Sequence, residues 1–350
     1  MSSTVFLFAI SIFFFLLFLW AFRNLPSEGW QIMATVPYRK QIDGSWRGIN
    51  LTYYGFFNAG ACVIACAILI ILMSSIDTPL IGTLSVTGVL LLLCFPAAKL
   101  IARLVEKKSS TFTVGGASFV GFLLMPWLIQ LFNQICGPVL GVRVPVVQML
   151  AAAAISYAFG EAFGRLACIS FGCCYGKALD TTPSRVQKFF RRSHFVFKGE
   201  TKKVAYEAAL SGRPLVPIQA VTAILSVAAG LAGTLFFLRA NWMIAAVIPI
   251  GTTQIWRVVS EIFRADYRGG GAFSAYQIMA LLVSIYSVAV LSILTPIATA
   301  FPDVSSGLRS IARPEVLLLL EGVWLAVFIF MGRSSVTGAS ISFHVVRDRV

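Results

Sequence analysis

The stretch from Gly164 to Lys177 holds the residues with the clearest capacity for chemistry. It reads Gly-Arg-Leu-Ala-Cys-Ile-Ser-Phe-Gly-Cys-Cys-Tyr-Gly-Lys, so an arginine and three cysteines lie where an apolar run gives way to a basic segment. Arg165 could bind a phosphate group, and a cysteine could act as a nucleophile if nearby cations stabilised its thiolate. A packing role is the alternative, because glycine and cysteine suit close helix contacts and an interfacial arginine often only reaches lipid head groups.

A second charged cluster begins at Arg257. Glu261 follows four residues later and Arg264 three residues after that, so the three side chains share one face of a predicted helix. With Arg268 and Asp266, the cluster has three arginines against two carboxylates. Ion pairing alone is one explanation of this row. The surplus cation favours another, in which an arginine binds a phosphate while Glu261 orients it.

Small and polar residues mark the beginnings of two further apolar stretches. Gly115 and Gly116 begin one of them, where they permit either close helix packing or a nest of backbone N–H groups for an anion. Gln219 lies just inside another and is expected to form hydrogen bonds toward the interior.

The composition is that of a membrane protein. Hydrophobic residues make up 58% of the chain and charged residues 12%, with a mean hydropathy of +0.85. The net charge of +14 comes from loops between apolar stretches, which indicates contact with anionic lipid rather than nucleic acid. The spacing of the seven cysteines is not typical of a zinc site, so we expect neither a metal nor another cofactor. Cys168, or one of the adjacent Cys173 and Cys174, could nevertheless oxidise with another thiol.

Nine apolar stretches are long enough to cross about 30 Å of hydrocarbon. They cover residues 1–22, 52–73, 80–104, 115–135, 145–163, 217–238, 242–263, 273–297 and 314–331. The sequence therefore predicts an all-α fold, a polytopic transmembrane helical bundle of about nine spans. Residues 23–51 are predicted as a polar loop, the C-terminus as a polar tail, and 164–216 as a small basic head segment on the membrane surface, for which a solvated loop is the alternative.

The motifs together resemble those of the bacterial prolipoprotein diacylglyceryl transferases. The stretch after residue 163 is similar to the Gly-Arg signature of that family, in a variant with Cys-Cys-Tyr-Gly, and Arg257, Glu261 and Arg264 are similar to its Arg-x-x-x-Glu-x-x-Arg. The other similar motifs are Tyr53-Tyr54-Gly55, Gly115-Gly116, Pro217-Ile218-Gln219, and Ser274 with Gln277. All six follow the order of the family over residues 50–298, which predicts a divergent member.

This resemblance implies a seven-span core with one extra span at each end. The expected division is an extra N-terminal span and loop at 1–51, four core spans at 52–163, the signature and head segment at 164–216, three core spans at 217–298, and an extra C-terminal span and tail at 299–350.

The resemblance also implies a reaction. A diacylglyceryl group would move from phosphatidylglycerol, or another anionic phospholipid, to the thiol of a lipobox cysteine in a prolipoprotein. The implied catalytic residues are Arg165, Arg257 and Glu261, with the two arginines holding the phosphate and Glu261 positioning one of them. The implied substrate-binding residues are Gly115, Gly116, Gly164, Gly172, Cys173, Gln219, Arg264 and Gln277. A non-catalytic lipid-binding subunit is the alternative, because Val114 and Thr222 stand where the family motifs have a His or Tyr and a Glu.

Two arguments disagree on which side of the membrane the motifs face. Nine spans place most of the 28 Lys and Arg residues on the same face as the motifs, and the positive-inside rule puts such a face in the cytoplasm. The resemblance instead implies the periplasmic face of the bacterial inner membrane. We expect the periplasmic face, because many of these cations lie in one long loop, where the rule weakens.

Overall fold

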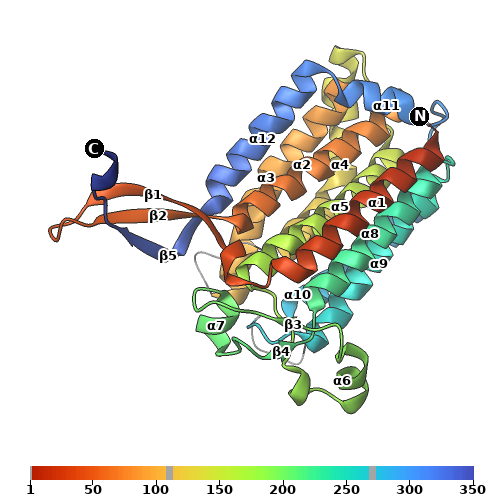
Figure 1. Ribbon diagram of the computed structural model, residues 1–350. Coiled ribbons are helices and arrows are strands. Elements are labelled where there is room, and N and C mark those ends of the chain that lie inside the picture. Colours follow the sequence, from red (N-terminus) through yellow and green to blue (C-terminus); the bar gives the residue numbers. More distant parts are fainter. Residues whose placement is uncertain (1, 108–112, 268–272) are drawn as a thin grey trace.

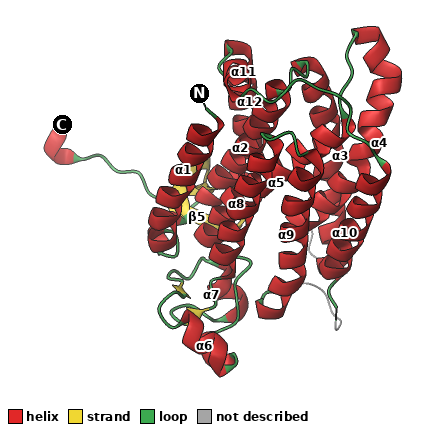
Figure 2. Ribbon diagram, turned by 90° about the vertical axis from the view of Figure 1, so that its right-hand side faces the viewer, coloured by secondary structure: helices red, strands yellow, loops and turns green. Residues whose placement is uncertain are grey.

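The computed structural model describes residues 2–107, 113–267 and 273–350. Within these ranges, nine helices are long and apolar enough to cross a membrane, and they pack side by side (Figure 1, Figure 2). They are α1 (Ser3–Asn24), α2 (Tyr53–Ser75), α3 (Leu80–Glu106), α4 (Val114–Leu140), α5 (Val146–Phe171), α8 (Ile218–Phe237), α9 (Trp242–Phe263), α10 (Ala275–Ile293) and α12 (Pro314–Gly332). The predicted all-α polytopic bundle is confirmed, and the chain is a multi-pass membrane protein.

Helix α5 lies at the centre of the bundle. It packs against α2, α8 and α9, and 78% of its most apolar stretch is buried, the largest share among the nine spans. Small residues allow this approach: a Cβ added at Gly160 would lie 3.0 Å from the Cβ of Ala65 in α2. Polar side chains of α5 therefore lie inside the protein rather than against lipid.

Helix α5 is also longer than predicted. The sequence placed the end of this span at residue 163, but the helix continues to Phe171. Its last two turns are mostly buried, and Arg165 pairs with Glu161 one turn earlier. The arginine therefore carries its counter-charge with it and does not end the span. This correction places Arg165 and Cys168 inside the helix.

A three-stranded antiparallel sheet joins the two ends of the chain. Strands β1 (Ile32–Lys40) and β2 (Trp46–Thr52) form a hairpin, and β5 (Arg333–Ile341) pairs with β2. The sequence predicted a polar loop at residues 23–51 and a polar C-terminal tail, and both predictions are wrong where these strands form. Most of their residues are at least partly exposed and the β2–β5 pair is far apart in sequence, so local patterning gave no clear strand signal. The sheet extends sideways from the bundle (Figure 1).

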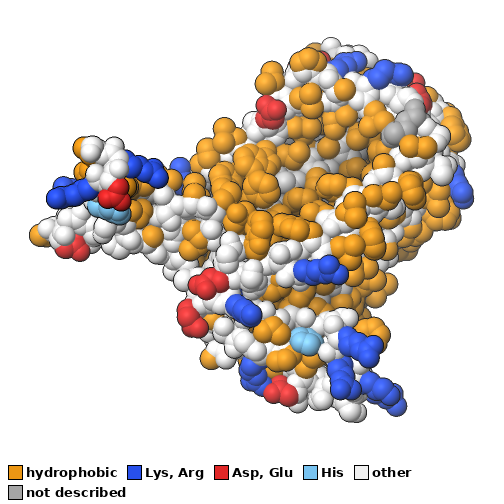
Figure 3. Space-filling view, viewed as in Figure 1, with side chains coloured by type: hydrophobic (Ala, Val, Ile, Leu, Met, Phe, Trp, Pro, Cys, Tyr) orange, Lys and Arg blue, Asp and Glu red, His pale blue; other side chains and the backbone are white. Residues whose placement is uncertain are grey.

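Residues 172–217 form the head at one end of the bundle. The head contains α6 (Ser184–Phe190), α7 (Lys203–Ala208) and the paired strands β3 (Phe195–Val196) and β4 (Pro214–Leu215). On the face seen in Figure 3, several Lys and Arg side chains lie over the head, whereas the side of the bundle is largely hydrophobic. Helix α11 (Val304–Ile311) lies at the other end (Figure 1). Short 3-10 helices occur at Glu28–Trp30, Leu179–Thr181 and Arg347–Arg349.

Candidate active site

A cavity of about 940 Å³ opens within the bundle near the head. Its walls come from α2, α3, α4, α5, α8, α9, α12, the head and strands β2 and β5. Leu69, Leu90, Phe122 and Met125 make its deeper part apolar, whereas arginines, carboxylates and thiols line the part near the head. This division of polarity suits an amphiphilic ligand whose polar group lies at the head end.

One buried carboxylate joins the two arginines that the sequence singled out for catalysis. Glu161 Oε1 accepts hydrogen bonds from Arg165 Nη2 at 2.5 Å and from Arg257 Nη2 at 3.0 Å. Glu161 and Arg165 are one turn apart on α5 and Arg257 comes from α9, so the packing of these two helices creates the arrangement. Arg257 also donates to the hydroxyl of Tyr157 at 2.5 Å.

The two guanidinium groups keep unused donors. The Nε atoms of Arg165 and Arg257 are buried and have no hydrogen-bond partner among the described residues. A buried donor without a partner costs about 1–3 kcal/mol, and more when it is charged. Two arginines sharing one carboxylate also leave one net positive charge. An anionic group in the cavity would satisfy both the free donors and this charge.

Gly115 provides the space for Arg257. A Cβ at this position would lie 2.5 Å from Arg257 Nη1, closer than side-chain atoms approach one another. Gly115 lies in the first turn of α4 and lines the cavity. Of the two explanations that the sequence left open, close helix packing fits Gly115, because the neighbours of such a Cβ are Arg257 of α9 and, at 3.1 Å, Tyr276 of α10.

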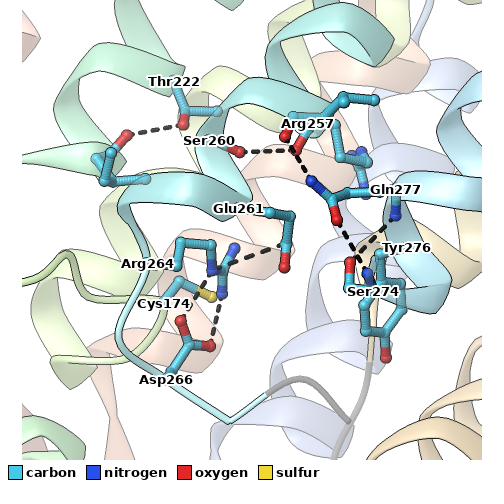
Figure 4. Close-up of polar contacts among 12 residues, drawn as sticks. Cys174, Thr222, Arg257, Ser260, Glu261, Arg264, Asp266, Ser274, Tyr276 and Gln277 are labelled. Atoms are coloured by element: carbon cyan, nitrogen blue, oxygen red, sulfur yellow. Dashed lines mark hydrogen bonds and ion pairs between the residues drawn. The ribbon is translucent and has the colours of Figure 1, made fainter. Parts of the chain in front are cut away.

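Arg264 completes the charged wall at the end of α9. Its Nε and Nη2 donate to the two carboxylate oxygens of Asp266 at 2.8 and 2.6 Å, and Glu261 Oε1 lies 3.9 Å from Nε. Figure 4 shows this group with the sulfur of Cys174 beside the Arg264 guanidinium. Gly176 of the signature pairs with Arg264 as an isolated β-bridge, which holds the signature against the end of α9. Arg268 of the same cluster lies outside the described residues.

The thiols of Cys168, Cys173 and Cys174 gather where the cavity meets the head. The pKa of Cys174 is held well below its usual range, because the thiols of Cys168 and Cys173 donate to its sulfur and because Arg264 and Arg165 favour the thiolate. On this wall of the cavity, guanidinium groups therefore favour the thiolate form of Cys174.

The structure brings most of the predicted site residues together. Those that line the cavity are Arg165, Arg257, Glu261, Gly115, Gly164, Cys173 and Arg264.

The four remaining residues are not among the lining residues, and the structure gives each a supporting role. Gly172 ends α5 with a φ of 71°, and Gly116 packs against α3. Gln219 Nε2 donates to the carbonyl of Cys173 at 2.9 Å. Gln277 completes a capping box at the start of α10 and donates to a carbonyl of α9.

Glu161 and Tyr157 were missed in the sequence. A usable signal existed, since Glu161 is a carboxylate in an apolar span four residues before Arg165, and charges within spans are rare and usually paired. Glu261 was expected to orient Arg165 or Arg257. The structure gives the bridging position to Glu161 and places Glu261 near Arg264, so the carboxylate between the two arginines comes from α5 and not from α9.

The sequence model of the prolipoprotein diacylglyceryl transferase family matches residues 44–293, well over half of the chain. The chain belongs to this family. No curated protein matches it. Membership confirms the predicted family and makes the chain a membrane-bound transferase of lipoprotein biosynthesis, whose family transfers a diacylglyceryl group to prolipoproteins.

The family match ends at the last residue of α10 and leaves out α1, α11 and α12. In this member of the transferase family, the segment after the match still contributes to the cavity. Phe330 of α12 and Arg333 of β5 line its wall. A Cβ at Gly55 would lie 2.1 Å from the Cα of Gly332, so the Tyr-Tyr-Gly motif of α2 allows the end of α12 to pack closely.

Proposed function

We propose that this chain transfers the diacylglyceryl group of phosphatidylglycerol to the thiol of a lipobox cysteine, in the inner membrane of a bacterium. The observation that carries this proposal is Glu161 shared between Arg165 and Arg257 at the head end of a cavity that is apolar further in. The negative charge of such a phospholipid matches the single net positive charge of these three side chains. Its polar head group and acyl chains match the polar and apolar parts of the cavity.

The reaction displaces a phosphate from carbon. The acceptor sulfur attacks the carbon of the diacylglyceryl group that is bonded to a phosphodiester oxygen. A C–S bond forms, and the C–O bond breaks with its electron pair moving to that oxygen. Glycerol phosphate leaves and takes up the proton lost by the thiol. Negative charge grows on the departing phosphate, and Arg165 and Arg257 stabilise it in a site with little water.

The arginines can be tested directly. Arg165→Ala and Arg257→Ala should each lower turnover by roughly 10² to 10³ while membrane insertion is kept, because removal of one such donor costs about 3 to 4 kcal/mol. Arg→Lys should restore little, since one ammonium cannot replace the several fixed N–H groups of a guanidinium. Arg309→Ala, at an exposed position on the other end of the bundle, is the matched control. Near wild-type turnover of both alanine variants would remove these residues from the mechanism.

The donor and the acceptor need a reconstituted assay. Purified protein in phosphatidylglycerol vesicles should release glycerol phosphate and attach a thioether-linked diacylglyceryl group to a lipobox peptide, as seen by mass spectrometry. Phosphatidylcholine vesicles serve as the control, because their lipid has no net negative charge. Binding of phosphatidylglycerol without either product would favour a lipid-binding subunit. Release of glycerol phosphate without a modified peptide would indicate another acceptor.

A further inference from the structure

Three thiols converge in space although their spacing in the sequence is not typical of a metal site. The Sγ atoms of Cys168, Cys173 and Cys174 all lie within 4.8 Å of one another, and those of Cys168 and Cys174 are 3.8 Å apart. All three are free thiols. Residues 168–174 join the last turn of α5 to the head, so one short segment supplies the whole cluster.

The backbone is shaped to bring these thiols together. Gly172 adopts a φ of 71° and ends α5, and the N–H of Cys173 donates to the carbonyl of Cys168 at 3.0 Å, which folds the chain back over the helix end. Cys174 has a φ of 54°, a conformation that costs a non-glycine residue about 1–2 kcal/mol. Gln219 fixes the carbonyl of Cys173 from α8. Local strain held in place by several contacts is common at functional sites.

The distances fit a shared metal ion better than a disulfide. A tetrahedral zinc ion with Zn–S bonds of about 2.3 Å holds its sulfurs about 3.8 Å apart, as found for Cys168 and Cys174, whereas a disulfide needs about 2.05 Å. We propose that Cys168, Cys173 and Cys174 bind one Zn²⁺ ion, and that the fourth coordination position is open toward the cavity for the thiol of the acceptor.

The position of the cluster supports this open site. All three cysteines line the same cavity as Arg165 and Arg257, and among the described residues the cluster consists of these three ligands. Zinc sites with three protein ligands and one open position are the catalytic kind. The assignment of the fourth position rests on the proposed function, because it is the acceptor thiol of that reaction that would occupy it.

Charge balance also permits this arrangement. Three thiolates and Zn²⁺ carry a net charge of −1, which becomes −2 when the acceptor thiolate binds. Arg264, beside Cys174, and Arg165, one turn before Cys168, can offset that charge. Coordination removes the proton of the acceptor thiol, and the sulfur then attacks the glyceryl carbon as described above, with the proton ending on the released glycerol phosphate.

Measurement of the zinc content tests the proposed metal site without an activity assay. The full-length protein, purified in detergent under reducing conditions and supplied with Zn²⁺, should hold about one zinc ion per chain. Cys168→Ser and Cys174→Ser should lower this content to less than about a tenth, because loss of one thiolate weakens such a site strongly. Cys62→Ser and Cys66→Ser are matched controls, since these thiols line the same cavity from α2 but lie outside the cluster.

Substitution with Co²⁺ tests the geometry and the open position. Tetrahedral thiolate coordination should give intense sulfur-to-cobalt charge-transfer bands, and a lipobox peptide should change these bands while its Cys→Ser form should not. Zinc content near zero, content unchanged in the cluster variants, or a Cys168–Cys174 disulfide in freshly purified protein would overturn the metal site. Bands that do not respond to the peptide would overturn the open position. A protein that binds zinc but releases no glycerol phosphate would instead contradict the proposed transferase reaction.

Discussion

At the scale of single residues, Glu161 determines whether Arg165 and Arg257 can lie next to each other. Its side chain is only 4% exposed and bonds to both guanidinium groups. Without its charge, two buried cations would face each other with no counter-ion, which typically costs about 3–5 kcal/mol. Glu161→Gln should therefore lower both the thermal unfolding midpoint in detergent and the release of glycerol phosphate.

Asp180→Asn is the control for that substitution. Asp180 pairs with Arg213 on the surface of the head, where an ion pair contributes at most about 1 kcal/mol. We expect little change in stability or turnover. If the Glu161 and Asp180 variants unfolded at the same temperature and were equally active, the bridging role of Glu161 would have to be abandoned.

Substitution of Gly115 tests the space around Arg257 without changing any charge. Gly115→Ala places a Cβ 2.5 Å from Arg257 Nη1 and should displace the guanidinium, so turnover should fall at least about tenfold, as expected when a catalytic group is misplaced by roughly 1 Å. Gly88→Ala in α3 has no heavy atom within 4 Å of the new Cβ and should behave like the wild type. Equal turnover of the two variants would show that Arg257 does not need its present position.

At the scale of elements, Lys202 ties the head to the bundle. Its fully buried ammonium donates to the carbonyls of Ser170 at 2.5 Å and Leu25 at 3.2 Å, near the C-terminal ends of α5 and α1. Such helix ends have unpaired carbonyls and favour a cation. Burial nevertheless lowers the pKa of Lys202 to about 8, below its ordinary value of 10.5.

This pKa predicts how stability depends on pH. Between about pH 8 and pH 10.5 the unfolded chain keeps the proton of Lys202 while the folded chain has lost it, so the folded state gains stability as the pH rises through this window. The gain is on the order of 3 kcal/mol. Lys202→Met should remove this part of the pH dependence of the unfolding midpoint, and Lys198→Met at an exposed position should keep it. Identical pH profiles of the wild type and Lys202→Met would show that the lysine does not titrate in this range.

At the scale of the whole molecule, the head, the sheet and the polar end of the cavity all lie toward one end of the bundle (Figure 1). We predict that this end faces the periplasm. In a Cys136→Ser background, which removes an exposed thiol, an impermeant maleimide should modify Ser193→Cys of the head in intact cells. Asn241→Cys, at the opposite end between α8 and α9, should react only after the membrane is opened. The reverse pattern would place the site in the cytoplasm and require an acceptor other than an exported lipoprotein.

The sequence by itself determined the membrane-spanning architecture and the family. An apolar run of about twenty residues must form a helix in lipid because its backbone groups have no other partners, so each span can be recognised from local sequence. The motifs that led to the family are equally local, as in Arg257, Glu261 and Arg264 at helical spacing. Because such motifs are local, the sequence pointed to Arg165 as a site residue but did not show which side chain it would contact.

Tertiary structure alone decided which of these residues meet. The bridge from Glu161 to Arg257 exists because α5 packs on α9, and the strand pair between β2 and β5 exists because the two ends of the chain return to the same side of the bundle. The thiol cluster depends on two left-handed backbone conformations, at Gly172 and Cys174, that the spacing of cysteines does not reveal. Contacts between distant segments arise from the burial and pairing of whole helices, and no short stretch of sequence carries that information.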